Sequence, residues 1–186
     1  MGILRVLVVP GYGCILTQEL KKYLNQVIVW IDEWRPNIVL FSGGFTQRQK
    51  APGVSEAALM REYVLGHVSY TDFTVAVDEY SYTTLDNIQN ATELMASLHY
   101  AGEEGGGGIE VQIFSEANRR FKVGVLARLA MLSRVKKIEV KSVAWEHGLI
   151  PKLKQVISTF AELAAFFIPS LARRFCESRI RRAEHI

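Results

Sequence analysis

Short, uninterrupted runs of apolar residues alternate along the chain with longer segments whose apolar residues recur every three or four positions. Residues 4–9 and 37–44 are two such runs, and each ends in a glycine turn. Continuous runs rich in valine, isoleucine and leucine favour strands that are buried on both faces of a parallel sheet. Residues 73–79 and 109–116 predict two further strands. Residues 136–145 alternate apolar with polar positions, which favours a fifth strand at a sheet edge.

The segments between these strands carry the signals of helix ends. Thr17 is a candidate N-cap for a helix that runs to about Trp34, and Pro36 stops that helix. Ser55 precedes the next helical segment. Later helices are expected at residues 85–98, at residues 121–132 and from about residue 151 to the end of the chain, the last one broken at Pro169.

The alternation of strand and helix, repeated about five times, predicts an α/β architecture with a mainly parallel five-stranded sheet and helices on both of its faces. We expect residues 1–150 to form this α/β domain. Residues 151–186 are expected to form a C-terminal helical extension packed on the same domain, with a basic tail from residue 173.

The composition is that of a folded chain of one domain. Of the 186 residues 49% are hydrophobic, which excludes a disordered protein, and the two cysteines favour a reducing compartment over a disulfide scaffold. The net charge of +3 conceals a division, because residues 1–110 hold 7 basic and 13 acidic groups whereas residues 111–186 hold 15 and 6. This division indicates an acidic site with a basic tail, or simply two differently solvated surfaces.

No segment predicts a membrane span or a signal peptide, and we expect a cytoplasmic protein. The N-terminus leads directly into the first strand. Residues 156–172 are apolar, but Glu162 and Pro169 interrupt them and they are shorter than the roughly 20 residues that a span needs. The arginines from residue 173 onward leave contact with a membrane surface open.

Small and polar residues follow each of the first four predicted strands. In a parallel sheet the carboxyl ends of the strands share one edge, here called the rim, and ligands bind there. The candidate ligand-binding residues at the rim are Gly11, Gly13, Ser42, Gly43, Gly44, Ser55, Ser81, Thr84, Asn87, Ser115, Asn118, Arg119 and Arg120. Their convergence predicts one binding site at this edge of the sheet.

Several of these residues have a structural interpretation beside the functional one. Residues 42–44 offer a hydroxyl and backbone N–H groups to an anion, or they form a tight turn that needs glycine. Ser55 and the helix turn after it present N–H groups to a phosphate, or Ser55 is only a cap. Arg119 and Arg120 are candidates to clamp phosphate or carboxylate, with one of the two at the surface.

Three carboxylates are candidates for catalysis, namely Glu56, Asp78 and Glu79. Asp78 and Glu79 together suit an acid/base pair, a pair of metal ligands or acceptors for ribose hydroxyls. Alternatively, they lie in a solvated turn before a helix that is capped at Thr83 or Thr84. The residue spacings resemble neither a zinc site nor a glycine-rich nucleotide motif, so no metal site is predicted.

Cys14 and His147 are two further candidates at the rim. Cys14 follows a glycine turn at a predicted helix start, where a thiolate nucleophile is favoured, or it is a small buried residue. His147 follows the fifth strand and is the histidine expected to come nearest to the rim.

The order of these motifs resembles the YdcF/SanA/ElyC-like proteins, domain-of-unknown-function family 218. Residues 42–44, residues 55–57 and Met60 match the S-G-G and S-E-A-x-x-M motifs of the family. The matches after the third strand are Ser81, Thr84 and Asn87. The resemblance covers residues 4–135, and Asn118 stands where the family has a histidine.

The resemblance implies a Rossmann-like three-layer sandwich and makes S-adenosylmethionine one candidate ligand. Because the polar groups converge on the rim, we expect a small nucleotide-like or phosphate-bearing metabolite to bind there. If the site turns over its ligand, we expect a hydrolase or transferase acting on a phosphorylated or activated metabolite. Family members with envelope functions carry an N-terminal anchor, and this chain, which starts at its first strand, resembles the soluble branch.

An alternative hypothesis is a non-catalytic interaction or envelope-associated module. In that case the arginine-rich residues 173–182 and the apolar helix before them contact a membrane surface or an acidic partner. Nucleic acid is not expected, because no recognised motif interleaves aromatic with basic side chains.

Overall fold

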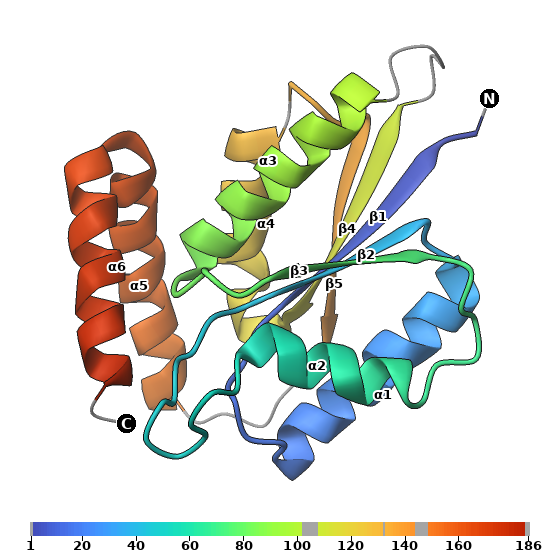
Figure 1. Ribbon diagram of the computed structural model, residues 1–186. Coiled ribbons are helices and arrows are strands. Elements are labelled where there is room, and N and C mark those ends of the chain that lie inside the picture. The colour runs from blue at the N-terminus through green and yellow to red at the C-terminus, as the bar shows by residue number, and fades with distance from the viewer. Residues whose placement is uncertain (1, 102–107, 132, 144–148, 185–186) are drawn as a thin grey trace.

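The computed structural model describes residues 2–101, 108–131, 133–143 and 149–184, and its strands and helices alternate along the chain (Figure 1). The strands are β1 (Leu4–Pro10), β2 (Ile38–Ser42), β3 (Thr74–Asp78), β4 (Ile109–Glu116) and β5 (Lys137–Val143). The helices are α1 (Gln18–Trp34), α2 (Glu56–Leu65), α3 (Thr84–Ala101), α4 (Arg120–Met131), α5 (Leu149–Phe167) and α6 (Pro169–Ala183), with a short 3-10 turn η1 (Ala117–Arg119) before α4.

The five strands form one parallel sheet in the order β3-β2-β1-β4-β5. Val6 of the central strand β1 pairs with Ile38 on one side and with Val111 on the other. β5 lies at an edge, as its alternating pattern predicts. The α/β architecture with a Rossmann-like sheet and C-terminal helices, expected from the sequence, is therefore confirmed.

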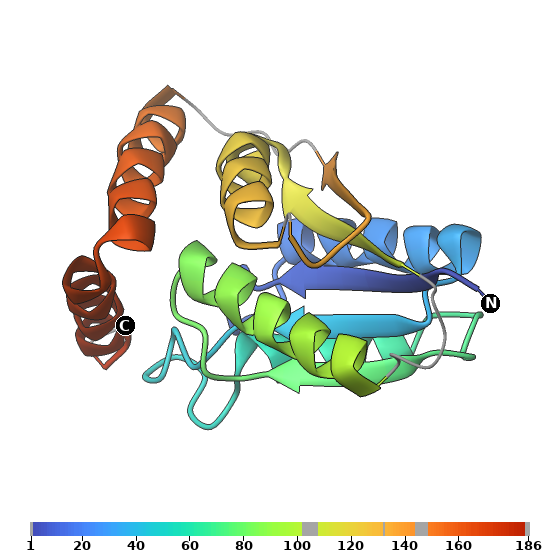
Figure 2. The same ribbon diagram turned by 90° about the horizontal axis from the view of Figure 1, so that it is seen from above.

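Helices cover both faces of the sheet, as Figures 1 and 2 show. Side chains alternate in direction along a strand, so Leu7 and Val9 pack with α1 and α2, whereas Val6 and Val8 pack with α3 and α4. All four of these β1 side chains are fully buried. The uninterrupted apolar run of β1 thus belongs to a strand with a hydrophobic core on each side.

The helix ends follow the local signals in the sequence. The Thr17 hydroxyl accepts the N–H of Leu20 at the start of α1, and α1 ends before Pro36. The Ser55 hydroxyl accepts the N–H of Ala58 at 3.0 Å and caps α2. Of the two caps considered for α3, the structure uses Thr83, whose hydroxyl accepts the N–H of Asp86.

The helices α5 and α6 form an antiparallel pair, here called the C-terminal hairpin, and Pro169 begins its second helix. The hairpin stands beside the domain on the side toward which β1 points (Figure 2). Three hydrogen bonds hold it near the rim. Glu162 of α5 accepts the N–H of Leu85 in α3 and the ammonium group of Lys122 in α4, and the side chain of Gln49, in the loop after β2, donates to the carbonyl oxygen of Glu184 directly after α6. Among the described residues, no helix is long and apolar enough to cross a membrane.

Candidate functional site

The side chains predicted at the ends of β2 and β3 contact one another in a closed hydrogen-bond network. The Ser42 hydroxyl lies 2.6 Å from Asp78 Oδ2 and 2.8 Å from Asn87 Oδ1. The Ser81 hydroxyl also donates to Asp78, and Asn90 Nδ2 donates to Ser81 at 3.0 Å. The sequence therefore located a real cluster, but its hydroxyls are engaged with protein carboxylate and amide groups.

Gly43 and Gly44, directly after β2, let three segments of the chain lie close together: the turn after β1, the turn after β2 and the turn after β3. The N–H groups of Gly43 and Gly44 donate to the carbonyl oxygens of Asp78 and Ser81, at 2.8 and 2.7 Å. A Cβ added to Gly44 would lie 2.9 Å from the carbonyl oxygen of Glu79. In this structure the turn thus fits the structural interpretation, and its two amides are already satisfied.

Ser55 and Glu79 form a second contact within the rim. The buried Ser55 hydroxyl lies 2.5 Å from Glu79 Oε1 while it also caps α2. Asp78 and Glu79, which the sequence suggested as a working pair, therefore contact different serines. Each carboxylate fixes a different segment, because Asp78 joins the end of β2 to the loop before α3 and Glu79 contacts the N-cap of α2.

Glu56, the first residue of α2, places its carboxylate among the glycine turns. A Cβ on Gly11 would lie 1.9 Å from Glu56 Oε2, and a Cβ on Gly43 would lie 2.8 Å from the same oxygen. The Thr46 hydroxyl donates to Glu56 Oε1, and the backbone N–H of Gly13 donates to the carboxylate as well. A buried protein carboxylate thus occupies the space beside the glycines where the sequence suggested a ligand anion.

Burial raises the pKa of the Glu56 carboxyl above its usual range. The hydrogen bond from Thr46 and the positive charge of Arg119 oppose part of this rise. A raised pKa moves a carboxyl toward the range in which it can serve as a general acid or base. This environment suits the catalytic role that the sequence suggested for Glu56.

The substitution Glu56→Gln is expected to raise the free energy of unfolding at pH 7. The folded carboxyl has the higher pKa, so the stability of the wild-type protein falls as the pH rises above the ordinary glutamate value of about 4.3. Glutamine removes this loss and keeps one acceptor oxygen, which the Thr46 hydroxyl and the N–H of Gly13 must then share. Urea unfolding from pH 4 to pH 8 measures the difference, which should shrink toward pH 4. Glu62→Gln, at an exposed position of the same helix, is the control, and an equal gain for both variants would contradict the assignment.

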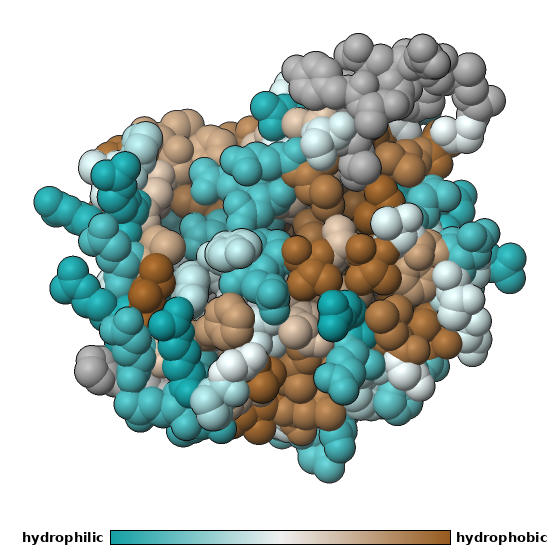
Figure 3. Space-filling view, in the orientation of Figure 1, coloured by the Kyte–Doolittle hydropathy of each residue, from teal (hydrophilic) through white to brown (hydrophobic). Residues whose placement is uncertain are grey.

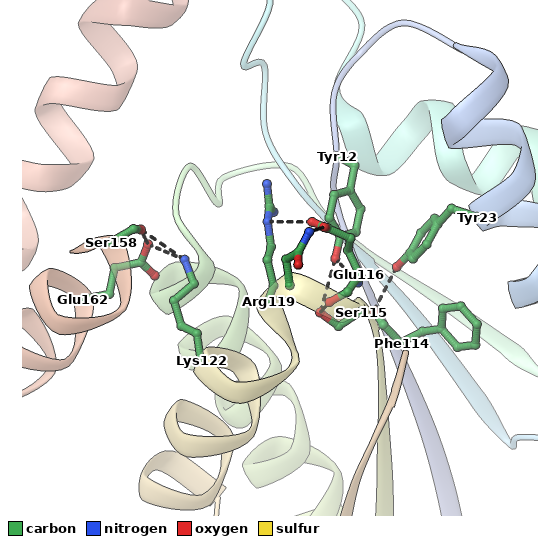
Figure 4. A network of polar contacts seen from close by, with 10 residues as sticks. Tyr12, Tyr23, Phe114, Ser115, Glu116, Arg119, Lys122, Ser158 and Glu162 are labelled. Carbon is green, nitrogen blue, oxygen red and sulfur yellow. Dashed lines mark hydrogen bonds and ion pairs between the residues drawn. The ribbon is translucent and has the colours of Figure 1, made fainter. Parts of the chain in front are cut away.

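A second group of polar side chains lies where β1 and β4 end side by side (Figure 4). The hydroxyl of Tyr12 accepts the N–H of Glu116 at 2.5 Å and lies 3.3 Å from the Ser115 hydroxyl. Asn118 Nδ2 donates to Glu116 Oε1 at 2.6 Å. Burial raises the pKa of Tyr12, so this phenol stays protonated at neutral pH. We call Tyr12, Ser115, Glu116, Asn118 and Arg119 the β1–β4 cluster.

Arg119 is the cation of this cluster. Its guanidinium carbon lies 4.5 Å from the centre of the Tyr12 ring, and its Nε lies 3.9 Å from Glu116 Oε2, which is too long for a hydrogen bond. Among the described residues Arg119 Nε is buried without a hydrogen-bond partner. In Figure 4 the side chain rises between Tyr12 and Lys122. Arg120, its neighbour in sequence, is exposed.

The position of the β1–β4 cluster in the sheet is itself informative. From β1 the chain crosses to β2 and β3 on one side of the sheet, and β4 and β5 lie on the other side. The carboxyl ends of β1 and β4 therefore meet at the point where the strand order reverses. In open α/β sheets, ligands bind at such a switch point.

Lys122 and Glu162 form a buried ion pair between α4 and α5 (Figure 4). Lys122 Nζ donates to Glu162 Oε1 at 3.0 Å and to the Ser158 hydroxyl at 3.2 Å, and Glu162 Oε2 accepts the backbone N–H of Leu85 at 3.1 Å. Burial lowers the pKa of Lys122, and the charge of Glu162 opposes that change. This contact fixes the C-terminal hairpin to the domain next to Arg119.

The other candidates from the sequence are accounted for as follows. Thr84 is the buried first residue of α3. Cys14 is buried, with Sγ 3.8 Å from the carbonyl oxygen of Gly44, and its environment fits the small buried residue of the two interpretations. His147 lies outside the described residues. In the described part of the chain, no group of three or more histidine, cysteine, aspartate or glutamate side chains is placed to hold a metal ion.

Sequence reasoning missed several side chains that complete the rim. Tyr12 lies in the turn predicted after the first strand, where the sequence indicated only Gly11 and Gly13 as ligand-binding residues. Thr46, Lys122 and Glu162 reach the rim through contacts between distant segments, so no local pattern indicates them. Glu162 was the available signal, because it interrupts the apolar residues 156–168 and a charge among such residues needs a buried partner.

Comparison with protein-family models, with curated proteins and with solved structures finds no match to this chain.

Proposed function

We propose that the rim binds a small metabolite with a phosphate or similar anionic group at the β1–β4 cluster. The observation that carries this proposal is Arg119, whose Nε is buried without a hydrogen-bond partner among the described residues, at the switch point of the sheet. An arginine binds phosphate or carboxylate oxygens through two parallel N–H groups. Such an anion would supply the acceptor that the described residues do not give to Nε.

The remaining groups suit a nucleotide-like molecule, of which S-adenosylmethionine is one candidate. The planar guanidinium of Arg119 has one face over the Tyr12 ring, and a base can stack on its other face. The Ser42, Asp78 and Ser81 network holds the neighbouring strand ends in place. In this proposal those residues position the site and do not bind the ligand.

A hydrolase or transferase acting on a phosphorylated or activated metabolite is the activity that suits this arrangement. Glu56, with its raised pKa, is the group that would transfer a proton, and the positive charge of Arg119 lies close enough to influence it. The resemblance to the YdcF/SanA/ElyC-like proteins, carried by residues 42–44, 55–57 and Met60, supports a ligand site at this same edge. Membership of that family is part of the proposal.

A thermal-shift panel tests the binding. Nucleotides, sugar phosphates and S-adenosylmethionine are added to the full chain, each beside its counterpart without the anionic group. A ligand at a hundredfold excess over its dissociation constant stabilises the protein by about 2.7 kcal/mol. We expect at least one anionic compound to raise the melting temperature while its uncharged counterpart does not. No shift with any compound, or equal shifts within every pair, would contradict the proposal.

A further inference from the structure

The helix α5 exposes an unusually apolar face to solvent. Five large apolar side chains on α5 and directly after it are about half exposed or more. They are Val156, Ile157, Phe160, Phe167 and Ile168. Phe160 and Phe167 are 70% and 69% exposed. Positions 156, 160 and 167 recur at helical spacing on the side of α5 opposite Glu162, which faces Lys122. We call these five residues the α5 stripe.

The neighbouring helix α6 adds positive charge beside the α5 stripe. The hairpin packs on the core through other side chains, the partly buried Leu163, Phe166 and Phe175. The exposed arginines of α6 are Arg173, Arg174, Arg179, Arg181 and Arg182. Of these, Arg179 lies on the rim side, close enough to Glu56 and Lys122 to act on their pKa values. Figure 3 shows hydrophilic side chains gathered over α6, and residues 149–184 contain seven basic and three acidic residues.

From this juxtaposition we propose that the outer face of the C-terminal hairpin docks onto an anionic lipid surface. Phenylalanine and isoleucine side chains insert at the boundary between headgroups and acyl chains, and arginines beside them bind lipid phosphates. A second copy of this chain fits the face less well, because docking two hairpins face to face would bring their arginines together. The proposal does not depend on a ligand at the rim.

Cosedimentation with vesicles tests the docking. The full chain is mixed with vesicles of phosphatidylcholine alone or of phosphatidylcholine with phosphatidylserine. We expect the protein to sediment with the anionic vesicles, and added salt should weaken that binding because it screens the arginines. Phe160→Gln with Phe167→Gln should lose most of the binding. Arg174→Gln with Arg181→Gln should weaken it roughly tenfold or more.

Matched variants and a second measurement separate the other outcomes. Phe121→Gln on α4 changes an equally exposed phenylalanine outside the α5 stripe, and it should sediment like the wild-type protein. Equal binding by all variants, equal binding to neutral vesicles or no binding at all would overturn the proposal. So would sedimentation velocity that shows a dimer for the wild-type chain and a monomer for the Phe160→Gln, Phe167→Gln variant, since the stripe would then be a contact between two copies.

Discussion

The substitution Glu162→Ala is expected to lower the free energy of unfolding by about 3–5 kcal/mol. It leaves the ammonium group of Lys122 buried without its counter-ion and removes the acceptor for the N–H of Leu85. Both groups then carry a desolvation cost that no new contact offsets. Urea unfolding at pH 7 measures the change in stability from the shift of the midpoint. The dependence of the unfolding free energy on urea concentration shows whether the hairpin still unfolds together with the domain.

Two further variants show whether the ion pair is the cause. Glu177→Ala removes an exposed glutamate from α6 and is expected to change the stability by less than about 0.5 kcal/mol. Lys122→Met combined with Glu162→Leu replaces the pair with apolar side chains and should recover much of the loss, since such replacements are often neutral. A loss below about 1 kcal/mol for Glu162→Ala would show that water reaches Lys122 and that the hairpin is not fixed there.

The substitution Gly44→Ala is expected to cost about 1–3 kcal/mol or more. Its new Cβ would lie 2.9 Å from the carbonyl oxygen of Glu79 and 3.0 Å from that of Ser81. These are backbone atoms, and the Ser81 carbonyl also accepts the N–H of Gly44, so the segments cannot move apart without breaking that bond. Thermal or urea unfolding measures the loss.

Gly66→Ala is the matched control for this glycine. A Cβ there would meet its nearest atom at 3.4 Å, which is close to an ordinary contact, and the residue has helical backbone angles. Its stability should therefore change by less than about 1 kcal/mol, in either direction. If both alanine variants were equally stable, the three segments at the rim would not be packed as closely as described.

Local signals were sufficient to predict the fold. The apolar runs gave the strands, and the caps at Thr17 and Ser55 gave helix starts that the structure reproduces. The strand ends converge because a parallel sheet with crossover helices leaves them no other edge. The alternation of strands and helices along the chain was therefore enough to predict which edge of the sheet forms the rim.

The roles of single side chains could not be predicted in the same way. Ser42 and Ser55 are residue types that bind anions, and each stands next to a glycine turn or a helix start. In the structure, however, each hydroxyl contacts a carboxylate that is 36 or 24 positions away in the sequence. Lys122 resembles a surface lysine of an ordinary helix, and its partner Glu162 is 40 positions distant. Such pairings depend on how helices pack on the sheet, and that information is not contained in any local pattern.

The most direct test of the proposed site compares Arg119→Gln with Arg120→Gln. Both variants remove one positive charge, but only Arg119 lies in the β1–β4 cluster, whereas Arg120 is exposed. Calorimetric titration uses the anionic compound that gives the largest thermal shift with the wild-type chain. Loss of a charge-assisted hydrogen bond costs about 1.5–3 kcal/mol, so Arg119→Gln should weaken binding by roughly tenfold to a hundredfold while Arg120→Gln binds like the wild-type protein. Equal affinities for the two variants would contradict a ligand site at the β1–β4 cluster.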